Sequence, residues 1–121
     1  MKVLVIDDSI EYRSRWKNLL EILNHEVVEA EDGNEGIDRI KDNNDLNLII
    51  SDLHMPDLNG IEMCRKIKEE NIKTPKILMV TTEANPDLKK QGIEVGVYKW
   101  ILKRHLTDDV FKMIINEMSK K

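Results

Sequence analysis

Five short apolar runs alternate with longer amphipathic stretches along this chain, and this alternation limits the folds that it can adopt. The stretches between the runs carry apolar side chains at helical spacing, such as Tyr12, Trp16 and Leu19. Strands that alternate with helices form a parallel sheet covered by helices on both faces. We therefore predict a doubly wound α/β fold with five parallel strands, in the order 2-1-3-4-5, and five helices. The predicted strands are residues 3–6, 27–30, 48–50, 77–80 and 100–102.

Local signals mark where some of these elements begin. Ser9 is placed to cap the first helix and Asn85-Pro86 to begin the fourth, whereas Asp32-Gly33 indicates a turn. The segment 87–95 has the weakest helical pattern, because it is rich in charge, contains Gly92 and has few apolar repeats. We expect a mobile element there.

Size and charge restrict the function classes. The chain has 121 residues, of which 40% are hydrophobic, and this fits one globular domain over residues 1–121. Charged residues make up 35%, but the net charge is only -4, which argues against general affinity for nucleic acid or anionic membranes. With no apolar run long enough to span a bilayer and no secretory signal, we expect a cytoplasmic protein. We also expect a monomer. Cys64 is the single cysteine, so we predict a core position and no disulfide.

Polar side chains follow four of the five predicted strands, at the point where each strand ends. Because the carboxyl ends of parallel strands meet at one edge of a sheet, these side chains should surround one pocket, the usual ligand site of open α/β folds. They are Asp7, Asp8, Asp52, Thr81, Thr82 and Lys103.

The chemistry of this set predicts a magnesium site that handles phosphate. Three carboxylates at close range repel one another unless a cation joins them, and Mg²⁺ prefers oxygen ligands and can bridge to a phosphate oxygen. Lys103 supplies a compact positive charge for a phosphoryl group, and Thr81 offers a hydroxyl donor. When a metal and a lysine neutralise the negative charge of the carboxylates and the phosphoryl group and hold the two in position, a carboxylate oxygen can act as a nucleophile toward a phosphodonor.

Four motifs now support a resemblance that covers essentially the whole chain. They are VLVIDDS at residues 3–9, SDLHMPDLNG at 51–60, LMVTTEA at 78–84 and WILK at 100–103. As a set they resemble the response-regulator receiver family, and LMVTTEA resembles its single-domain chemotaxis members more than its transcriptional ones. The resemblance implies a flavodoxin-like, CheY-like sheet.

The resemblance also implies roles for individual residues. Asp52 would be the phosphoacceptor, and Mg²⁺ would be held by Asp7, Asp8, Asp52 and the main-chain carbonyl of His54. Thr81 and Lys103 would bind the phosphoryl group, and Thr81 and Trp100 would form the switch pair. The residues that tune the lifetime of the phosphorylated form would be His54, Thr82 and Glu83.

Partners follow from the same resemblance. The phosphodonor would be a sensor histidine kinase of the CheA-like type. The output surface would be the fourth helix, fifth strand and fifth helix, roughly residues 86–118. Its partner would be an output protein such as a flagellar motor component, or a phosphatase. The chain would then be a two-component signalling switch and not an enzyme, although it can catalyse its own phosphorylation and dephosphorylation.

Two departures from the family pattern concern the pocket. Arg104 stands where the family commonly has proline after the lysine, so the Lys103-Arg104 peptide is either trans or strained cis, and the reach of Lys103 is open. Thr82 stands where many relatives carry a smaller alanine, and we expect it to narrow access to the phosphoryl group.

Other interpretations of the same residues exist. Asp7-Asp8 could cap a helix, Asp52 could serve a turn, and Lys103 could be a solvated charge. At the level of function, the alternatives are a Mg²⁺-dependent phosphohydrolase that forms an aspartyl phosphate, and a receiver-fold interaction module that is not phosphorylated. The short chain and the directly adjacent Asp7 and Asp8 argue against the hydrolase, whereas Arg104 leaves the second alternative open.

Overall fold

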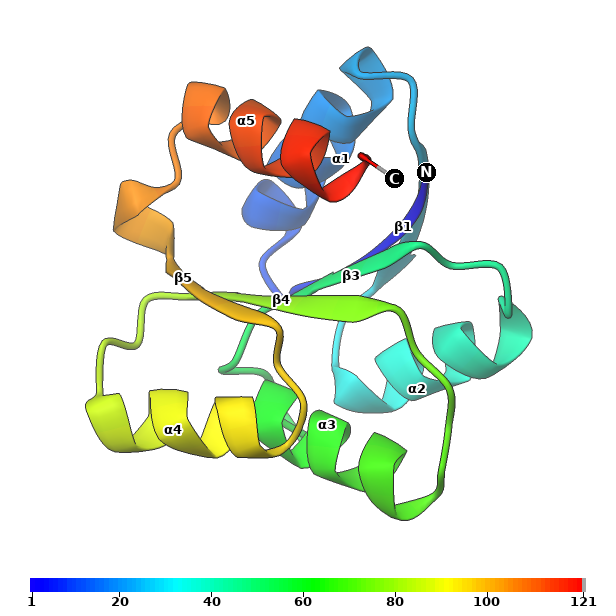
Figure 1. Cartoon of the computed structure of the whole chain (residues 1–121), viewed down its shortest axis with the longest axis vertical. Helices are drawn as coiled ribbons and strands as arrows, with labels where there is room; N and C mark the ends of the chain where they lie inside the picture. Colours follow the sequence, from blue (N-terminus) through cyan, green and yellow to red (C-terminus); the bar gives the residue numbers. More distant parts are fainter. Residues whose placement is uncertain (121) are drawn as a thin grey trace.

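The computed structural model describes residues 1–120, which form a five-stranded sheet and five main helices (Figure 1). All neighbouring strands pair in parallel, and the strand order is β2-β1-β3-β4-β5, which confirms the predicted fold. The strands are β1 Lys2–Ile6, β2 Glu26–Ala30, β3 Leu48–Ser51, β4 Lys76–Thr81 and β5 Lys99–Leu102. The helices are α1 Ile10–Ile22, α2 Gly33–Asp42, α3 Gly60–Glu69, α4 Pro86–Glu94, α5 Asp108–Met118 and a short 3-10 turn, Lys103–His105.

The sheet separates two apolar layers. Helices α1 and α5 cover one face, and α2, α3 and α4 cover the other (Figure 1). Successive strand side chains point to opposite faces. In β1, Val3 and Val5 therefore pack into the cluster with α1 and α5, whereas Leu4 and Ile6 pack into the cluster on the opposite side. Burial on both sides explains why β1 and β3 contain continuous apolar runs, whereas the edge strand β2 includes Glu26 and Glu29 and is only partly buried.

Side-chain caps fix where the helices begin. The Ser9 hydroxyl and the Asn85 side chain accept hydrogen bonds from backbone N–H groups of α1 and α4, as predicted. Asp32 differs from its predicted place in a turn. Its carboxylate accepts from the Glu35 N–H at 2.9 Å and caps α2, because an extended acidic residue satisfies a free N–H group at a helix start.

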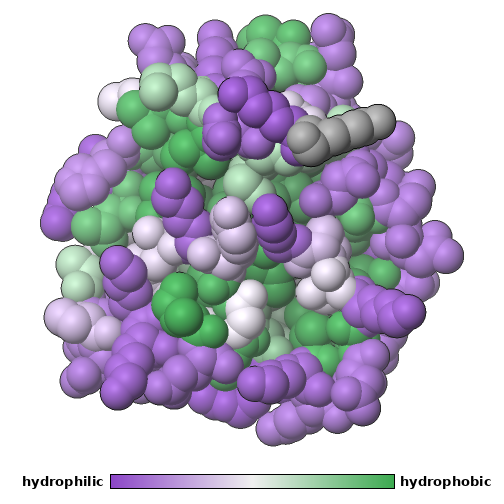
Figure 2. Space-filling model, viewed as in Figure 1, coloured by the Kyte–Doolittle hydropathy of each residue, from purple (hydrophilic) through white to green (hydrophobic). Residues whose placement is uncertain are grey.

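Helix α4 forms over Pro86–Glu94, and the mobility predicted for this segment stays a prediction. Gly92 is its buried residue. Across residues 1–120, none of the helices combines the length and the apolar character that a membrane crossing requires. Figure 2 shows hydrophilic side chains over much of one face, with apolar side chains between them.

Candidate functional site

The topology brings Asp7 and Asp52 together at the carboxyl edge of the sheet. Strands β1 and β3 are neighbours, and Ile6 pairs with Ser51 at their ends, so the next residue of each strand enters the same pocket. One carboxylate oxygen from each of Asp7, Asp8 and Asp52 lies within 4.8 Å of the others. The structure thus brings together the three acids that the sequence singled out.

Backbone hydrogen bonds orient the two buried carboxylates. The Ser9 N–H donates to Asp7 Oδ1 at 2.9 Å, and the Leu53 N–H donates to Asp52 Oδ1 at 2.8 Å. The second oxygen of each carboxylate, Oδ2, faces the side chain of Lys103. Each acid therefore presents one oxygen to the pocket while the other is held in place.

Burial makes the negative charge of Asp52 costly. The side chains of Asp7 and Asp52 are buried, whereas Asp8 is exposed. Burial first, and the nearby charge of Asp7 second, raise the pKa of Asp52 above its ordinary value, although Lys103 and the Leu53 N–H oppose the shift. A cation that enters the pocket would relieve this cost.

Lys103 reaches the acids despite the Arg104 that follows it. The Lys103-Arg104 peptide is trans, and the lysine lies at the start of the 3-10 turn after β5. Its Nζ atom is 3.0 Å from Asp7 Oδ2 and 3.4 Å from Asp52 Oδ2, and its side chain is 6% exposed. The alternative of a solvated surface charge does not fit this burial.

Thr81 and Trp100 meet at one residue, Glu83. The Glu83 N–H donates to the Thr81 hydroxyl oxygen at 3.1 Å, and Trp100 Nε1 donates to the Glu83 carbonyl at 3.0 Å. Thr81 is fully buried at the end of β4. The backbone of Glu83 therefore connects the two side chains of the predicted switch pair.

The other predicted pocket residues lie at its rim. His54 Nε2 is 3.3 Å from a Glu83 carboxylate oxygen, so the loop after β3 contacts the loop after β4. Thr82 is exposed. The tuning roles of His54, Thr82 and Glu83 stay predictions, as does the metal contact of the His54 carbonyl.

The donor set of the pocket fits Mg²⁺. Three carboxylates offer the hard oxygen ligands that Mg²⁺ prefers, and the exposed side of Asp8 leaves room for the water that this ion retains. The raised pKa of Asp52 is consistent with a pocket whose negative charge is incompletely balanced by the protein itself.

Comparison with known proteins decides the family. The response regulator receiver domain family matches residues 3–115 of the chain. The chain belongs to this family.

Several receiver relatives are similar over most of their length. A chemotaxis protein CheY homologue of Campylobacter jejuni is 39% identical over 105 residues, which are 85% of this chain and 81% of that protein. The chemotaxis protein CheY1 of Helicobacter pylori is 37% identical over 105 residues, 85% of each chain. The structure of Vibrio cholerae chemotaxis protein CheY4 has a TM-score of 0.85 at 31% identity and covers 97% of both chains. The receiver domain of NarL from Mycobacterium tuberculosis, at 21% identity and a TM-score of 0.85, shows the shared fold alone.

These similarities support a response regulator of a two-component system. CheY-like receiver domains are signalling switches and not classical enzymes, and they work with a histidine kinase and a downstream target.

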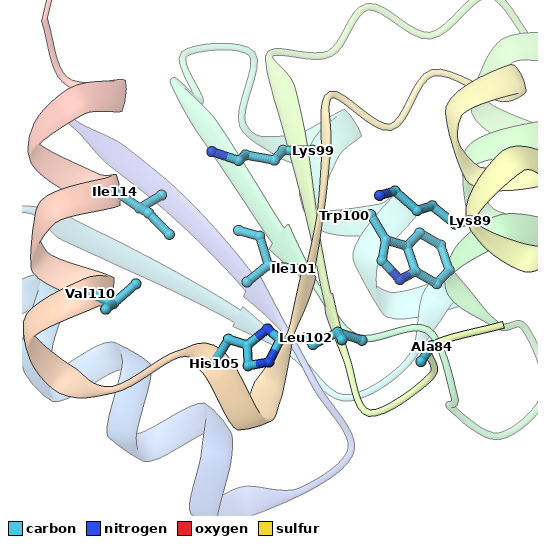
Figure 3. Close-up of a pocket in the computed structure, with 9 residues that line it drawn as sticks. All are labelled: Ala84, Lys89, Lys99, Trp100, Ile101, Leu102, His105, Val110 and Ile114. Atoms are coloured by element: carbon cyan, nitrogen blue, oxygen red, sulfur yellow. The ribbon is translucent and has the colours of Figure 1, made fainter. Parts of the chain in front are cut away.

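The receiver domain has a groove of about 360 Å³ along α4, β5 and α5. Figure 3 shows Trp100 on the α4 side of β5, and Val110 and Ile114 projecting from α5 on the other side. Basic and apolar side chains share the lining, and the residues are Ala84, Lys89, Lys99, Trp100, Ile101, Leu102, His105, Val110 and Ile114.

Two residues of α1 that contact the pocket residues Asp7 and Lys103 were not identified from the sequence. Arg13 is buried, and its Nη1 donates to the Asp7 carbonyl at 2.7 Å while its Nε donates to Glu29 at 3.2 Å. Tyr12 was noted only as an apolar helix position, yet its ring centroid lies 3.9 Å from Lys103 Nζ. Their place in the first turn of α1, three and four residues after the cap Ser9, is the signal that could have directed attention to them.

Proposed function

We propose that this receiver domain, acting as one unit over residues 1–121, accepts a phosphoryl group on Asp52 from a sensor histidine kinase in a Mg²⁺-dependent reaction. The observation that carries the proposal is the convergence of Asp7, Asp8 and Asp52 within 4.8 Å, with Lys103 Nζ between Asp7 and Asp52. Two buried carboxylates and one exposed carboxylate at this spacing, with a buried lysine, match what a phosphoryl group and its metal require.

Asp52 is oriented for nucleophilic attack. With Oδ1 bound to the Leu53 N–H, Oδ2 is the oxygen that faces the pocket. In the proposed step a bond forms between Oδ2 and phosphorus while the bond from phosphorus to its leaving group breaks, and the electron pair departs with the leaving group. Lys103 binds one phosphoryl oxygen, and the Thr81 hydroxyl donates to another.

Asp7, Asp8 and Asp52, with the main-chain carbonyl of His54, would hold the metal. When bound, Mg²⁺ supplies positive charge that lowers the repulsion between the carboxylates and the incoming phosphoryl oxygens. Arg13 contributes from outside the pocket, because its hydrogen bond to the Asp7 carbonyl fixes the backbone that carries the Asp7 side chain.

The switch would work through Glu83. When the Thr81 hydroxyl turns to the phosphoryl group, its hydrogen bond with the Glu83 N–H is lost. The Glu83 carbonyl is bound to Trp100, so a shift of this backbone alters the position of the indole in the groove of Figure 3. Phosphorylation would thereby favour an arrangement of α4, β5 and α5 that binds the output partner more tightly.

Residues at the rim would set how long the phosphoryl group survives. His54 and Glu83 contact each other at 3.3 Å, and Thr82 directly precedes Glu83 in the sequence. Their side chains would control the approach of the water that hydrolyses the aspartyl phosphate.

We propose a chemotaxis role because the relatives from Campylobacter, Helicobacter and Vibrio are named chemotaxis proteins. The kinase would then be CheA-like, and the output partner a flagellar motor component or a phosphatase. Lys89 and Lys99 in the groove favour a partner segment with acidic side chains.

Intact-protein mass after incubation with acetyl phosphate tests the proposal. We expect one phosphoryl adduct with Mg²⁺, none with chelator and none in Asp52→Asn. Asp57→Asn is the matched control, because Asp57 is an exposed acid of the same loop and its φ of 66° suits asparagine. Absence of an adduct in every condition would favour the unphosphorylated interaction module. Release of phosphate from small phosphoesters over many turnovers would favour the phosphohydrolase.

A further inference from the structure

Lys103 has a third neighbour besides Asp7 and Asp52, and this neighbour is aromatic. The Nζ atom lies 3.9 Å from the centroid of the Tyr12 ring, a distance at which an ammonium is attracted to the ring face. Because the Lys103 side chain is only 6% exposed, little water competes for this contact. The ammonium is therefore held by two carboxylates and one ring.

The Tyr12 ring is itself fixed by the core. It stacks on Trp16 with centroids 5.9 Å apart, and Trp16 stacks on Phe111 of α5 at 4.8 Å. Trp16 and Phe111 are 1% and 2% exposed. The ring under Lys103 thus rests on a buried aromatic column and not on a mobile surface side chain.

The three contacts of Lys103 differ in whether they can remain when a metal and a phosphoryl group occupy the pocket. Asp7 and Asp52 are the carboxylates that the proposed metal and phosphoryl group also need, so their oxygens cannot be reserved for the lysine. The ring of Tyr12 has no charge to share with a metal. It is the contact that persists while both acids are engaged.

We propose that Tyr12 is a positioning residue whose ring face holds the Lys103 ammonium at the pocket when Asp7 and Asp52 turn to the metal and the phosphoryl group. This inference rests on the proposed phosphorylation of Asp52. A lysine side chain has four rotatable bonds. An aromatic ring that restricts their rotation beforehand lowers the conformational entropy that the lysine loses when it binds the phosphoryl group.

The matched pair of variants is Tyr12→Leu, which removes the ring, and Tyr12→Phe, which keeps the ring face and loses only the hydroxyl. Tyr98→Leu is the control, because Lys76 Nζ lies 4.5 Å from the Tyr98 ring, so it removes a similar contact outside the acid pocket. Tyr12→Met serves as a second ring-free variant if Tyr12→Leu does not fold.

The first readout needs neither metal nor phosphodonor. In the proton NMR spectrum, the methylene next to Lys103 Nζ should be shifted upfield by the Tyr12 ring current in the wild type. The shift should remain in Tyr12→Phe, disappear in Tyr12→Leu and be unchanged in Tyr98→Leu. A wild-type Lys103 methylene without this shift overturns the proposed contact.

The second readout is the rate of adduct formation with acetyl phosphate and Mg²⁺. Tyr12→Leu should react about threefold to tenfold more slowly than wild type, the range that a partly desolvated cation–π contact supplies. Tyr12→Phe and Tyr98→Leu should react at the wild-type rate. A wild type that forms no adduct overturns the proposed function. A wild type that forms one at the same rate as Tyr12→Leu overturns the positioning role alone.

Discussion

At the scale of single residues, the pocket keeps a carboxylate in surroundings that disfavour its charge. Asp52 is buried beside Asp7, and the counter-charge of Lys103 does not fully offset this, so its pKa is raised. The folded protein therefore holds a proton on Asp52 more tightly than the unfolded chain does. Such a group costs stability at neutral pH and is retained where function needs it.

We predict that Asp52→Asn raises the free energy of unfolding at neutral pH in the presence of chelator. The Asp52 contribution to wild-type stability is fully present below the ordinary carboxyl pKa of 3.8 and is lost as the pH rises through the raised pKa of the folded state. The uncharged amide does not undergo this loss. Urea unfolding of both proteins at several pH values should show a difference in unfolding free energy that grows as the pH rises from 3.8 through the raised pKa and is constant above it. A difference independent of pH throughout would contradict the account.

The thiol of Cys64 should be inert in the folded protein. Burial raises the pKa of this thiol to about 12, and the thiolate is the form that reacts with disulfide reagents. At neutral pH, a disulfide reagent should therefore label Cys64 only when the protein unfolds, and urea should accelerate the labelling. In the fully unfolded chain, one thiol per molecule should react. Rapid labelling without denaturant would show that the packing of α3 against the core does not bury this side chain.

At the scale of elements, α4 approaches β5 closely because Gly92 has no side chain. A Cβ atom at position 92 would lie 2.8 Å from Cζ3 of Trp100, which is closer than such atoms pack. The glycine thus admits the indole whose Nε1 binds the Glu83 carbonyl. The helix and the predicted switch residue depend on each other's position.

Inside helices, a change from glycine to alanine commonly raises the free energy of unfolding by about 1 kcal/mol. We predict that Gly92→Ala does not give this increase. The new methyl group must displace the Trp100 ring, which should also change its fluorescence. In a protein that already carries Trp100→Leu, Gly92→Ala should raise the free energy of unfolding by the usual amount. The free energies of unfolding of the four proteins form a double-mutant cycle. A full gain in the wild-type background, with unchanged fluorescence, would contradict the close approach.

The elements were predictable from the sequence because their patterns are local. Continuous apolar runs indicated the strands, and the parallel arrangement alone placed Asp7, Asp8 and Asp52 at one edge. The contacts of α1 were not predictable. The position of the Tyr12 ring under Lys103 depends on how α1 packs against the strand ends, which no local pattern in the sequence records. Asp32 was placed in a turn because a turn and a helix cap use the same residue types.

At the scale of the whole molecule, stability should be unevenly distributed. Strands β1 and β3 lie inside the sheet and are buried on both faces, whereas Gly92 is the buried residue of α4. An element with little buried side-chain surface has a low free energy of local unfolding. The face proposed for output would then combine the loosely held helix α4 with α5, which buries Phe111 and Ile115.

Amide hydrogen exchange measures this distribution directly. We predict that backbone amides of β1 and β3 exchange last, through global unfolding, and that those of α4 exchange fastest among the five helices. Helix α5, which buries Phe111 and Ile115, is the internal reference. Equal protection of α4 and α5 would contradict the predicted mobility.

The central claim concerns one oxygen atom, Oδ2 of Asp52, and the bond that it forms. Borohydride reduces an acyl phosphate of aspartate to homoserine, so reduction of the phosphorylated protein followed by peptide mass analysis locates the bond. The account predicts homoserine at position 52 after incubation with acetyl phosphate and Mg²⁺, and none when chelator replaces the metal. Conversion at Asp7, Asp8 or Asp57, or a phosphoryl adduct that borohydride does not reduce, would contradict it.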